Sequence, residues 1–262
     1  MTIENGYLRE PSSDKYWSFE DELKGKMVTL FDGDVDLRPW CSPRSHQKRT
    51  GSCVGQAIVN ALELKRIMKY GADAHIDLSP MMLYYVARSL MVPPEVDLDK
   101  GTFIYLACDA IRKFGVCTED SWKFKLKNLY KKPSMSAFEE ASHHKIESHY
   151  KIMSEGNDRV DEVIASLRAG NPVVFGTEVG KEWKSYRKFP CKVLEPLGIP
   201  ETTMSSHATT IVGYKDGLFI GENSWGEKWW GLDGFYKMQP EVIASPKSRD
   251  FWVIQAGFED LK

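Results

Sequence analysis

Residues 47–56 read Gln-Lys-Arg-Thr-Gly-Ser-Cys-Val-Gly-Gln, and this stretch decides how the rest of the chain is interpreted. Gly51 allows a sharp turn and Ser52 is a common helix cap, so Cys53 is expected in the first turn of a helix. The apolar residues that follow recur at helical spacing, which predicts an amphipathic helix packed on a core: Ile58, Val59, Ala61, Leu62, Leu64, Ile67 and Met68. The free N–H groups of a helix N-terminus stabilise a thiolate, which favours a nucleophilic role for Cys53. This segment alone supports equally well a small buried cysteine that only packs.

Two later stretches supply possible partners for a nucleophile. Residues 205–214 read Ser-Ser-His-Ala-Thr-Thr-Ile-Val-Gly-Tyr, and residues 221–226 read Gly-Glu-Asn-Ser-Trp-Gly. With these motifs the chain resembles the papain-like cysteine peptidases, whose members carry a Gln, a Gly-Ser-Cys turn, a His before an apolar strand, and an Asn-Ser-Trp-Gly signature. Gln47 precedes Cys53 by six residues and Asn223 follows His207 by sixteen, as in the family. Four functional residue types in the right order and spacing make a chance match improbable, and the resemblance extends over roughly residues 36–256.

The resemblance implies a role for each of these residues. Cys53 and His207 would form a thiolate–imidazolium pair, and Asn223 would hydrogen-bond the far ring nitrogen of His207. The side-chain amide of Gln47 and the backbone N–H of Cys53 would bind the oxyanion. This chemistry requires neither a cofactor nor a metal.

Residues that shape substrate binding follow the family pattern less closely. Val54 follows the nucleophile where relatives usually carry Trp, and Ser206 stands before His207 where Asn or Asp is common. Gly101, after Lys100, takes the place of the glycine pair that binds a substrate backbone in relatives, and Trp225 would cover the bond between His207 and Asn223. Gly101, Ser206 and Trp225 are therefore the expected substrate-binding residues, while substrate preference does not carry over from the family.

The order of elements predicts an α+β chain with a papain-like, two-lobed fold and a cleft between the lobes. Helical patterns come first, at residues 79–90, 102–114 and 157–170. Strand patterns follow, at residues 173–175, 208–214, 218–221, 234–238 and 251–255. We expect an N-terminal strap at 1–35 and a peptidase domain at 36–262, with the helical lobe mainly at 36–156 and the antiparallel β lobe mainly at 157–262. By the resemblance the strap runs along the surface, is too short for the usual helical inhibitory propeptide, and stays attached.

Composition limits the partners and the compartment. The net charge of −2 and the pI near 6.3 show no excess of positive charge, so nucleic acid is not an expected partner. The start of the chain lacks the pattern of a signal peptide and no apolar run reaches membrane-spanning length, so no membrane partner is expected. Five cysteines are an odd number, and Thr50 stands where secreted relatives carry a bridging cysteine; both facts favour the reducing cytoplasm.

His143, His144 and His149 lack the cysteines or carboxylates that would complete a zinc site, so surface or strand positions are expected.

The resulting hypothesis is a cysteine peptidase that hydrolyses peptide bonds in a protein or peptide substrate through an acyl-enzyme. A related thiol acyl-transfer enzyme remains the alternative: a deamidase, a transglutaminase-like enzyme or an exopeptidase. A catalytically inactive papain-fold binding protein is disfavoured because the four site residues are all present.

Overall fold

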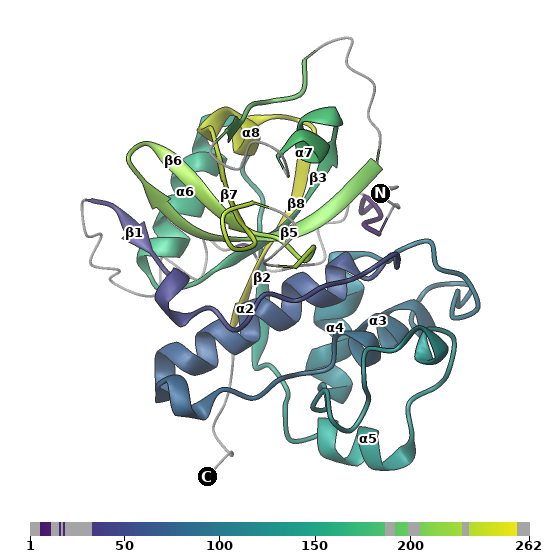
Figure 1. Ribbon diagram of the computed structural model, residues 1–262. Coiled ribbons are helices and arrows are strands. Elements are labelled where there is room, and N and C mark those ends of the chain that lie inside the picture. The colour runs from purple at the N-terminus through teal and green to yellow at the C-terminus, as the bar shows by residue number, and fades with distance from the viewer. Residues whose placement is uncertain are drawn as a thin grey trace.

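The chain folds into two lobes that meet along one long helix (Figure 1). The computed structural model describes residues 6–11, 16, 18, 33–186, 192–198, 205–226 and 231–255. Helices from the first half of the chain form one lobe, and a sheet built mostly from the second half forms the other. The predicted α+β, papain-like architecture is therefore confirmed.

The helical lobe is built on helix α2 (Cys53–Tyr70), which begins at the predicted nucleophile. The other helices of this lobe are α3 (Pro80–Ser89), α4 (Ile104–Phe114) and α5 (Met135–Ala141). Ser79 caps α3 as expected, because its Oγ accepts a hydrogen bond from the N–H of Met82 at 3.2 Å and Pro80 occupies the first turn. Gly115, with φ of 79°, ends α4 in a conformation that glycine adopts without strain.

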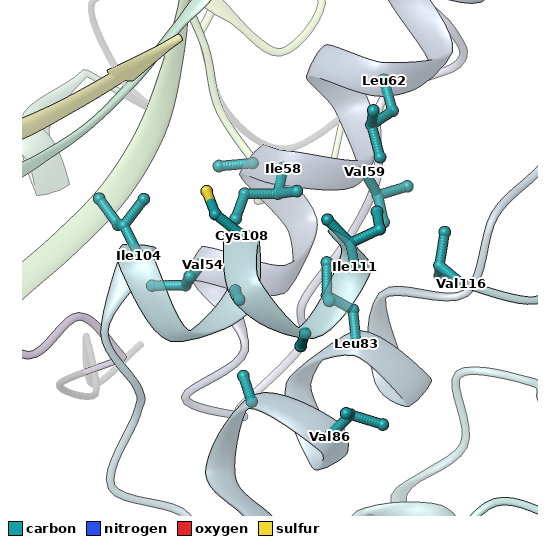
Figure 2. Packing of buried hydrophobic residues seen from close by; sticks show 14 of the residues in the cluster. Val54, Ile58, Val59, Leu62, Leu83, Val86, Ile104, Cys108, Ile111 and Val116 are labelled. Atoms are coloured by element: carbon teal, nitrogen blue, oxygen red, sulfur yellow. The ribbon is translucent and has the colours of Figure 1, made fainter. Parts of the chain in front are cut away.

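Helices α2, α3 and α4 pack through a continuous apolar cluster (Figure 2). The predicted core residue Cys108 is fully buried on α4, beside side chains such as Val54 and Ile58 of α2. Sheet residues, among them Trp252, belong to the same cluster, so α2 is held from both lobes. Burial of this kind contributes about 25 cal/mol per Å² of apolar surface removed from water, which fixes the position of α2 firmly.

The sheet contains eight strands among the described residues, in the order β2-β8-β3-β5-β6-β7-β4, with β1 paired to β5. All pairings are antiparallel except that of β4 with β7. The strands are β1 (Val35–Asp36), β2 (Ser148–Ile152), β3 (Val173–Val179), β4 (Val193–Leu194), β5 (Ser205–Lys215), β6 (Leu218–Glu222), β7 (Phe235–Met238) and β8 (Ser248–Gln255).

Shorter helices complete both lobes. Helices α6 (Gly156–Arg168), α7 (Lys181–Ser185) and α8 (Pro240–Ala244) lie on the sheet side, and short 3-10 helices span Arg38–Trp40, Ala72–Ala74 and Leu126–Asn128. A second apolar cluster joins α6, α7 and α8 to the sheet. Strand β5 packs on α2, where the hydroxyl of Thr210 donates to the carbonyl of Ala57 at 2.9 Å. The contact between β5 and α2 sets the distance between the lobes at the site.

Some local predictions differ from the structure. Ser52 precedes α2 but does not cap it with its side chain; its hydroxyl instead lies 2.8 Å from that of Thr50. Helix α5 and strands β1 and β2 were not predicted, because they are short and their apolar residues do not repeat regularly. Strand β2 joins the sheet from the stretch that connects the helices to α6, and it carries His149.

The first described residues lie between the two lobes, not only on the surface. Tyr7 forms a parallel bridge with Thr102 at the start of α4, and the N–H of Leu8 donates to the carbonyl of Thr102 at 3.0 Å. Tyr7 is 5% exposed and belongs to the apolar cluster that joins the helical lobe to the sheet. The surface course expected for the strap is therefore wrong for these residues.

Among the described helices, none is long and apolar enough to cross a bilayer.

Candidate active site

The loop before α2 fixes Cys53 at the start of the helix. Gly51 donates its N–H to the carboxylate of Asp99 at 2.9 Å, and the hydroxyl of Tyr84 donates to the same oxygen at 2.8 Å. The N–H of Ala208 on β5 points at the sulfur of Cys53 at 3.4 Å. Cys53 itself is fully buried. Helix α2 and strand β5 thus meet at the sulfur, from opposite lobes.

His207 stands one residue before Ala208 and is oriented by Asn223. The Nε2 of His207 lies 2.8 Å from Oδ1 of Asn223, which also accepts the N–H of Ser224 at 2.8 Å. An amide oxygen only accepts, so Nε2 carries the proton and Nδ1 is left as the basic nitrogen. The ring of Trp225 lies 4.8 Å from that of His207, at 32°, and helps to exclude water from the bond.

Gln47 is held in place by both of its amide atoms. Its Nε2 donates to the carbonyl of Thr50 at 2.9 Å, and its Oε1 accepts the hydroxyl of Ser224 at 2.6 Å. The backbone N–H of Gln47 donates to the carbonyl of Ser224 at 2.8 Å. One N–H of the amide is used in these bonds, so the second is available to a ligand beside Cys53. The structure therefore brings Gln47, Cys53, His207 and Asn223 into one site.

The N-terminal segment 6–11 covers this site. A Cβ added to Gly6 would lie 2.6 Å from the sulfur of Cys53 and 2.7 Å from the carbonyl oxygen of Gly51. Any side chain at this position would collide with the sulfur of Cys53 and with the backbone of Gly51. The main chain at Gly6 thus occupies the space that a reacting group would need.

Ser206, one of the expected substrate-binding residues, holds this segment together with Thr102. The carbonyl of Ser206 accepts the N–H of Gly6 at 3.4 Å, and the N–H of Thr102, next to Gly101, donates to the carbonyl of Gly6 at 3.2 Å. A Cβ on Gly101, whose φ is 92°, would fall 2.5 Å from the carbonyl of Gly6. Gly101 and Ser206 therefore lie beside the main chain at Gly6, while Trp225 packs on the ring of His207.

Burial decides the protonation states in this covered form. Exclusion of water raises the pKa of the Cys53 thiol to about 12, although hydrogen bonds from the N–H groups of Ala208 and Val54 act to lower it. Burial also lowers the pKa of His207 to about 4, against the opposing effect of its bond to Asn223. A neutral thiol and a neutral imidazole are therefore favoured at pH 7. Burial therefore disfavours the predicted thiolate–imidazolium pair while the segment covers the site.

Sequence reasoning missed several residues that build the site. Tyr84 and Asp99 support the loop of the nucleophile, and Tyr84 accepts the N–H of Gly101 at 3.0 Å. Trp183 on α7 lies 5.8 Å from His207 and 5.9 Å from Trp225, ring to ring. None of the three stands in a motif, and only the fold brings them to the site.

The three clustered histidines have different surroundings in the structure. His143 is exposed, whereas His144 is buried with its Nδ1 3.0 Å from the carbonyl of Val116. His149 packs against Trp252 and lies 3.5 Å from Asp109. Within the described ranges, no group of three His, Cys, Asp or Glu residues is placed to hold a metal ion.

Comparison with known proteins identifies the family of this chain. Residues 33–248 match the sequence profile described as papain family cysteine protease, and the chain therefore belongs to that family. It is 30% identical over 253 residues to an uncharacterized peptidase C1-like protein of Acanthamoeba polyphaga mimivirus, with 92% of this chain and 79% of the viral protein covered.

Solved structures of other proteins share the fold. The chain is similar to xylellain, a cysteine protease from Xylella fastidiosa, with a TM-score of 0.82, 27% identity and 97% of each chain covered. It is also similar in fold to digestive procathepsin L 3 of the Tenebrio molitor larval midgut, with a TM-score of 0.66 and 16% identity, over 97% of this chain and 76% of the other.

Proposed function

We propose that this protein is a cysteine peptidase that hydrolyses peptide bonds through an acyl-enzyme intermediate. The observation that carries the proposal is the convergence of Cys53 at a helix N-terminus, His207 with Nδ1 free to act as a base, and Gln47 beside them. Membership of the papain family supports the same reaction.

In the proposed mechanism the thiol of Cys53 transfers its proton to Nδ1 of His207, and the sulfur attacks the scissile carbonyl carbon. The oxyanion accepts hydrogen bonds from the free N–H of Gln47 and from the backbone N–H of Cys53. The intermediate collapses as His207 gives its proton to the leaving amine. Water, deprotonated by His207, then releases the acyl group and restores the thiol. Asn223 keeps the imidazole in the tautomer that these steps need.

Turnover requires the segment around Gly6 to leave the site. Its main chain stands against the sulfur of Cys53, so a substrate carbonyl cannot approach while it is docked. Departure of the segment admits water, which reduces the desolvation that holds Cys53 and His207 neutral. We therefore assign the thiolate–imidazolium pair to the uncovered form.

The proposed function is tested with a fluorogenic peptide mixture, comparing the wild-type chain with Cys53→Ala. Hydrolysis by the wild type and none by the variant, with matching circular dichroism spectra, is the expected result. Equal rates in both would overturn the proposal. Mass spectrometry of the products separates peptide-bond cleavage from deamidation, from acyl transfer to an amine, and from removal of terminal residues only.

We also propose that the protein works in a reducing compartment such as the cytoplasm. Cys41, Cys53, Cys108 and Cys117 are all free thiols in the structure; Cys191 lies outside the described residues. A reducing environment keeps a nucleophilic thiol active. Cell fractionation with an antibody to the protein tests this location.

A further inference from the structure

Glu222 is a buried carboxylate that the proposed mechanism does not use. It is the last residue of β6 and directly precedes Asn223 in the chain. Its side chain is 1% exposed, and its Oε1 accepts a hydrogen bond from Nη1 of Arg44 at 3.1 Å. Arg44 stands three residues before Gln47, the proposed oxyanion donor. This ion pair therefore joins the end of β6 to the segment that carries Gln47.

The segment that carries Gln47 runs antiparallel to the Asn-Ser-Trp-Gly motif. His46 forms an antiparallel bridge with Trp225, and the backbone N–H of Gln47 donates to the carbonyl of Ser224 at 2.8 Å. Arg44 lies at the start of this paired segment, and its side chain reaches from the segment to the sheet. The pair of Arg44 with the sheet thus fixes one end of the segment, and the backbone pairing fixes the other.

Strand β7 holds Arg44 in a defined orientation. The Cζ atom of Arg44 lies 4.5 Å from the centroid of the Phe235 ring. A Cβ added to Gly234 would fall 2.4 Å from Cγ of Arg44, so the aliphatic part of the side chain packs directly on the glycine. Phe235 is the register partner of Glu222 in the pairing of β6 with β7. The guanidinium is therefore guided to the carboxylate, and a change in the ion pair acts on the backbone before Gln47.

We propose that Glu222 is a positioning residue for catalysis: through Arg44 it fixes the segment that places the side-chain amide of Gln47 beside Cys53. This proposal rests on the peptidase activity proposed above. A donor must be held within about 0.5 Å of its productive position to act on the reacting group. Complete loss of an oxyanion donor costs roughly a hundredfold to a thousandfold in rate, so a looser donor should cost less, about threefold to tenfold.

The charge of Glu222 makes this positioning depend on pH. Burial raises the pKa of Glu222 to about 7, against the opposing effects of Arg44 and of the Cys41 thiol, and Glu63 on α2 adds to the rise. On β7 it faces the apolar ring of Phe235. The ionised carboxylate is therefore present above pH 7 and is lost as the pH falls below it. Glu222→Gln resembles the protonated form at every pH, so the loss of kcat/KM that the wild type shows between pH 8 and 6 should be smaller in this variant.

The test compares two reactions of Cys53 in the full-length wild type, Glu222→Gln and Gln47→Ala. Hydrolysis of a peptide coumarin amide forms an oxyanion, whereas alkylation by iodoacetamide forms none. Both rates scale with the fraction of enzyme that is uncovered, so their ratio does not depend on the docking of the N-terminal segment. At pH 8 we expect this ratio to fall by about threefold to tenfold in Glu222→Gln, and further in Gln47→Ala. The alkylation rate itself should stay close to that of the wild type.

A double variant shows whether Glu222 acts through Gln47. If it does, Glu222→Gln combined with Gln47→Ala should hydrolyse the peptide no more slowly than Gln47→Ala alone. Losses that multiply in the double variant would overturn the positioning role. An equal loss of alkylation and hydrolysis in Glu222→Gln would also overturn it, because a general disturbance of the site affects both reactions.

Two further variants complete the test. Arg44→Lys keeps the positive charge but not the planar guanidinium, and should lower the ratio by about twofold or more even if Glu222→Gln is unstable. Asp120→Asn removes a carboxylate that is 94% exposed and should keep the wild-type ratio. A wild-type ratio in both Glu222→Gln and Arg44→Lys overturns the assignment and leaves the peptidase proposal standing. No hydrolysis of any peptide by the wild type overturns both.

Discussion

At the scale of single residues, Gly6 decides access to the sulfur of Cys53. Its missing side chain lets the main chain approach Cys53 and Gly51 more closely than any other residue could. Close contact with rigid backbone cannot be relieved by rotation of a side chain. A single methyl group at this position is therefore enough to weaken docking of the segment over the site.

We expect Gly6→Ala to raise peptidase activity. Overpacking of this kind costs on the order of 1–3 kcal/mol, so kcat/KM should rise by about tenfold to a hundredfold if most of the wild type is covered. Because burial holds the pKa of Cys53 near 12, uncovering should also move its alkylation by iodoacetamide to lower pH. Both quantities are measured on the same samples, with labelling located by mass spectrometry.

Gly198→Ala is the matched control, since nothing lies within 4 Å of a Cβ at Gly198. It should behave as wild type. A Gly6→Ala protein with unchanged labelling and unchanged turnover would show that the segment does not restrict access.

At the scale of elements, the buried Arg88 ties α3 to the loop that carries Asp99. Arg88 is fully buried, and its guanidinium donates to the carbonyls of Val96 at 3.1 Å, Leu98 at 2.5 Å and Leu129 at 2.5 Å. Asp99 in turn accepts the N–H of Gly51, two residues before the nucleophile. A single side chain thus connects helix α3 to the residue that supports the loop before Cys53.

Arg88→Ala should lower the free energy of unfolding by roughly 3 kcal/mol, because three carbonyls lose the hydrogen bonds of a buried guanidinium. Urea denaturation followed by tryptophan fluorescence measures the change. The exposed Arg112 on α4 is the control, and Arg112→Ala should stay within about 0.5 kcal/mol of wild type. A similar loss of unfolding free energy in both variants would contradict a special role for Arg88.

Elements with local signals were predictable, and elements defined by distant contacts were not. Ser79 with Pro80 marks the start of α3, and Gly115 marks the end of α4, each through backbone chemistry confined to a few residues. Strand β2, in contrast, reads Ser-His-Tyr-Lys-Ile, and only its pairing with β8 makes it a strand. The sequence-based expectations therefore succeed where capping and periodicity dominate.

The same distinction applies to the site across the whole molecule. The motifs identified Cys53, His207, Asn223 and Gln47, and the fold gathers them. The hydrogen bond of Tyr7 to Asp250 joins residues 243 positions apart, and no local sequence pattern predicts it. The course of the N-terminal segment was consequently mispredicted, because tertiary contacts with both lobes determine it.

Stability of the whole protein should fall in acid because of His149. Burial lowers the pKa of His149 to about 4, in spite of Asp109 nearby, so the folded state holds the neutral ring. A depressed pKa gives stability that is present above the unfolded value near 6.5 and lost as pH falls towards 4. The full effect is roughly 3 kcal/mol.

Urea unfolding at several pH values between 7 and 4 tests this expectation. His149→Asn should unfold with a shallower dependence on pH than wild type, whatever its stability at pH 7. His143→Asn is the control, because His143 is exposed, and it should keep the wild-type slope. Parallel slopes for all three proteins would assign the acid sensitivity to other groups.

The position of β8 has a consequence for the order of synthesis. This strand, the last in the described part of the chain, lies between β2 and β3 and carries Asp250. A ribosome releases the chain from its N-terminus, so β2 and β3 emerge without the neighbour that joins them. The sheet closes, and Tyr7 gains its anchor, only when residues 248–255 have left the tunnel. His207 and Asn223 precede β8 in the chain, so the residues of the site are all synthesised before the strand that anchors Tyr7 over it.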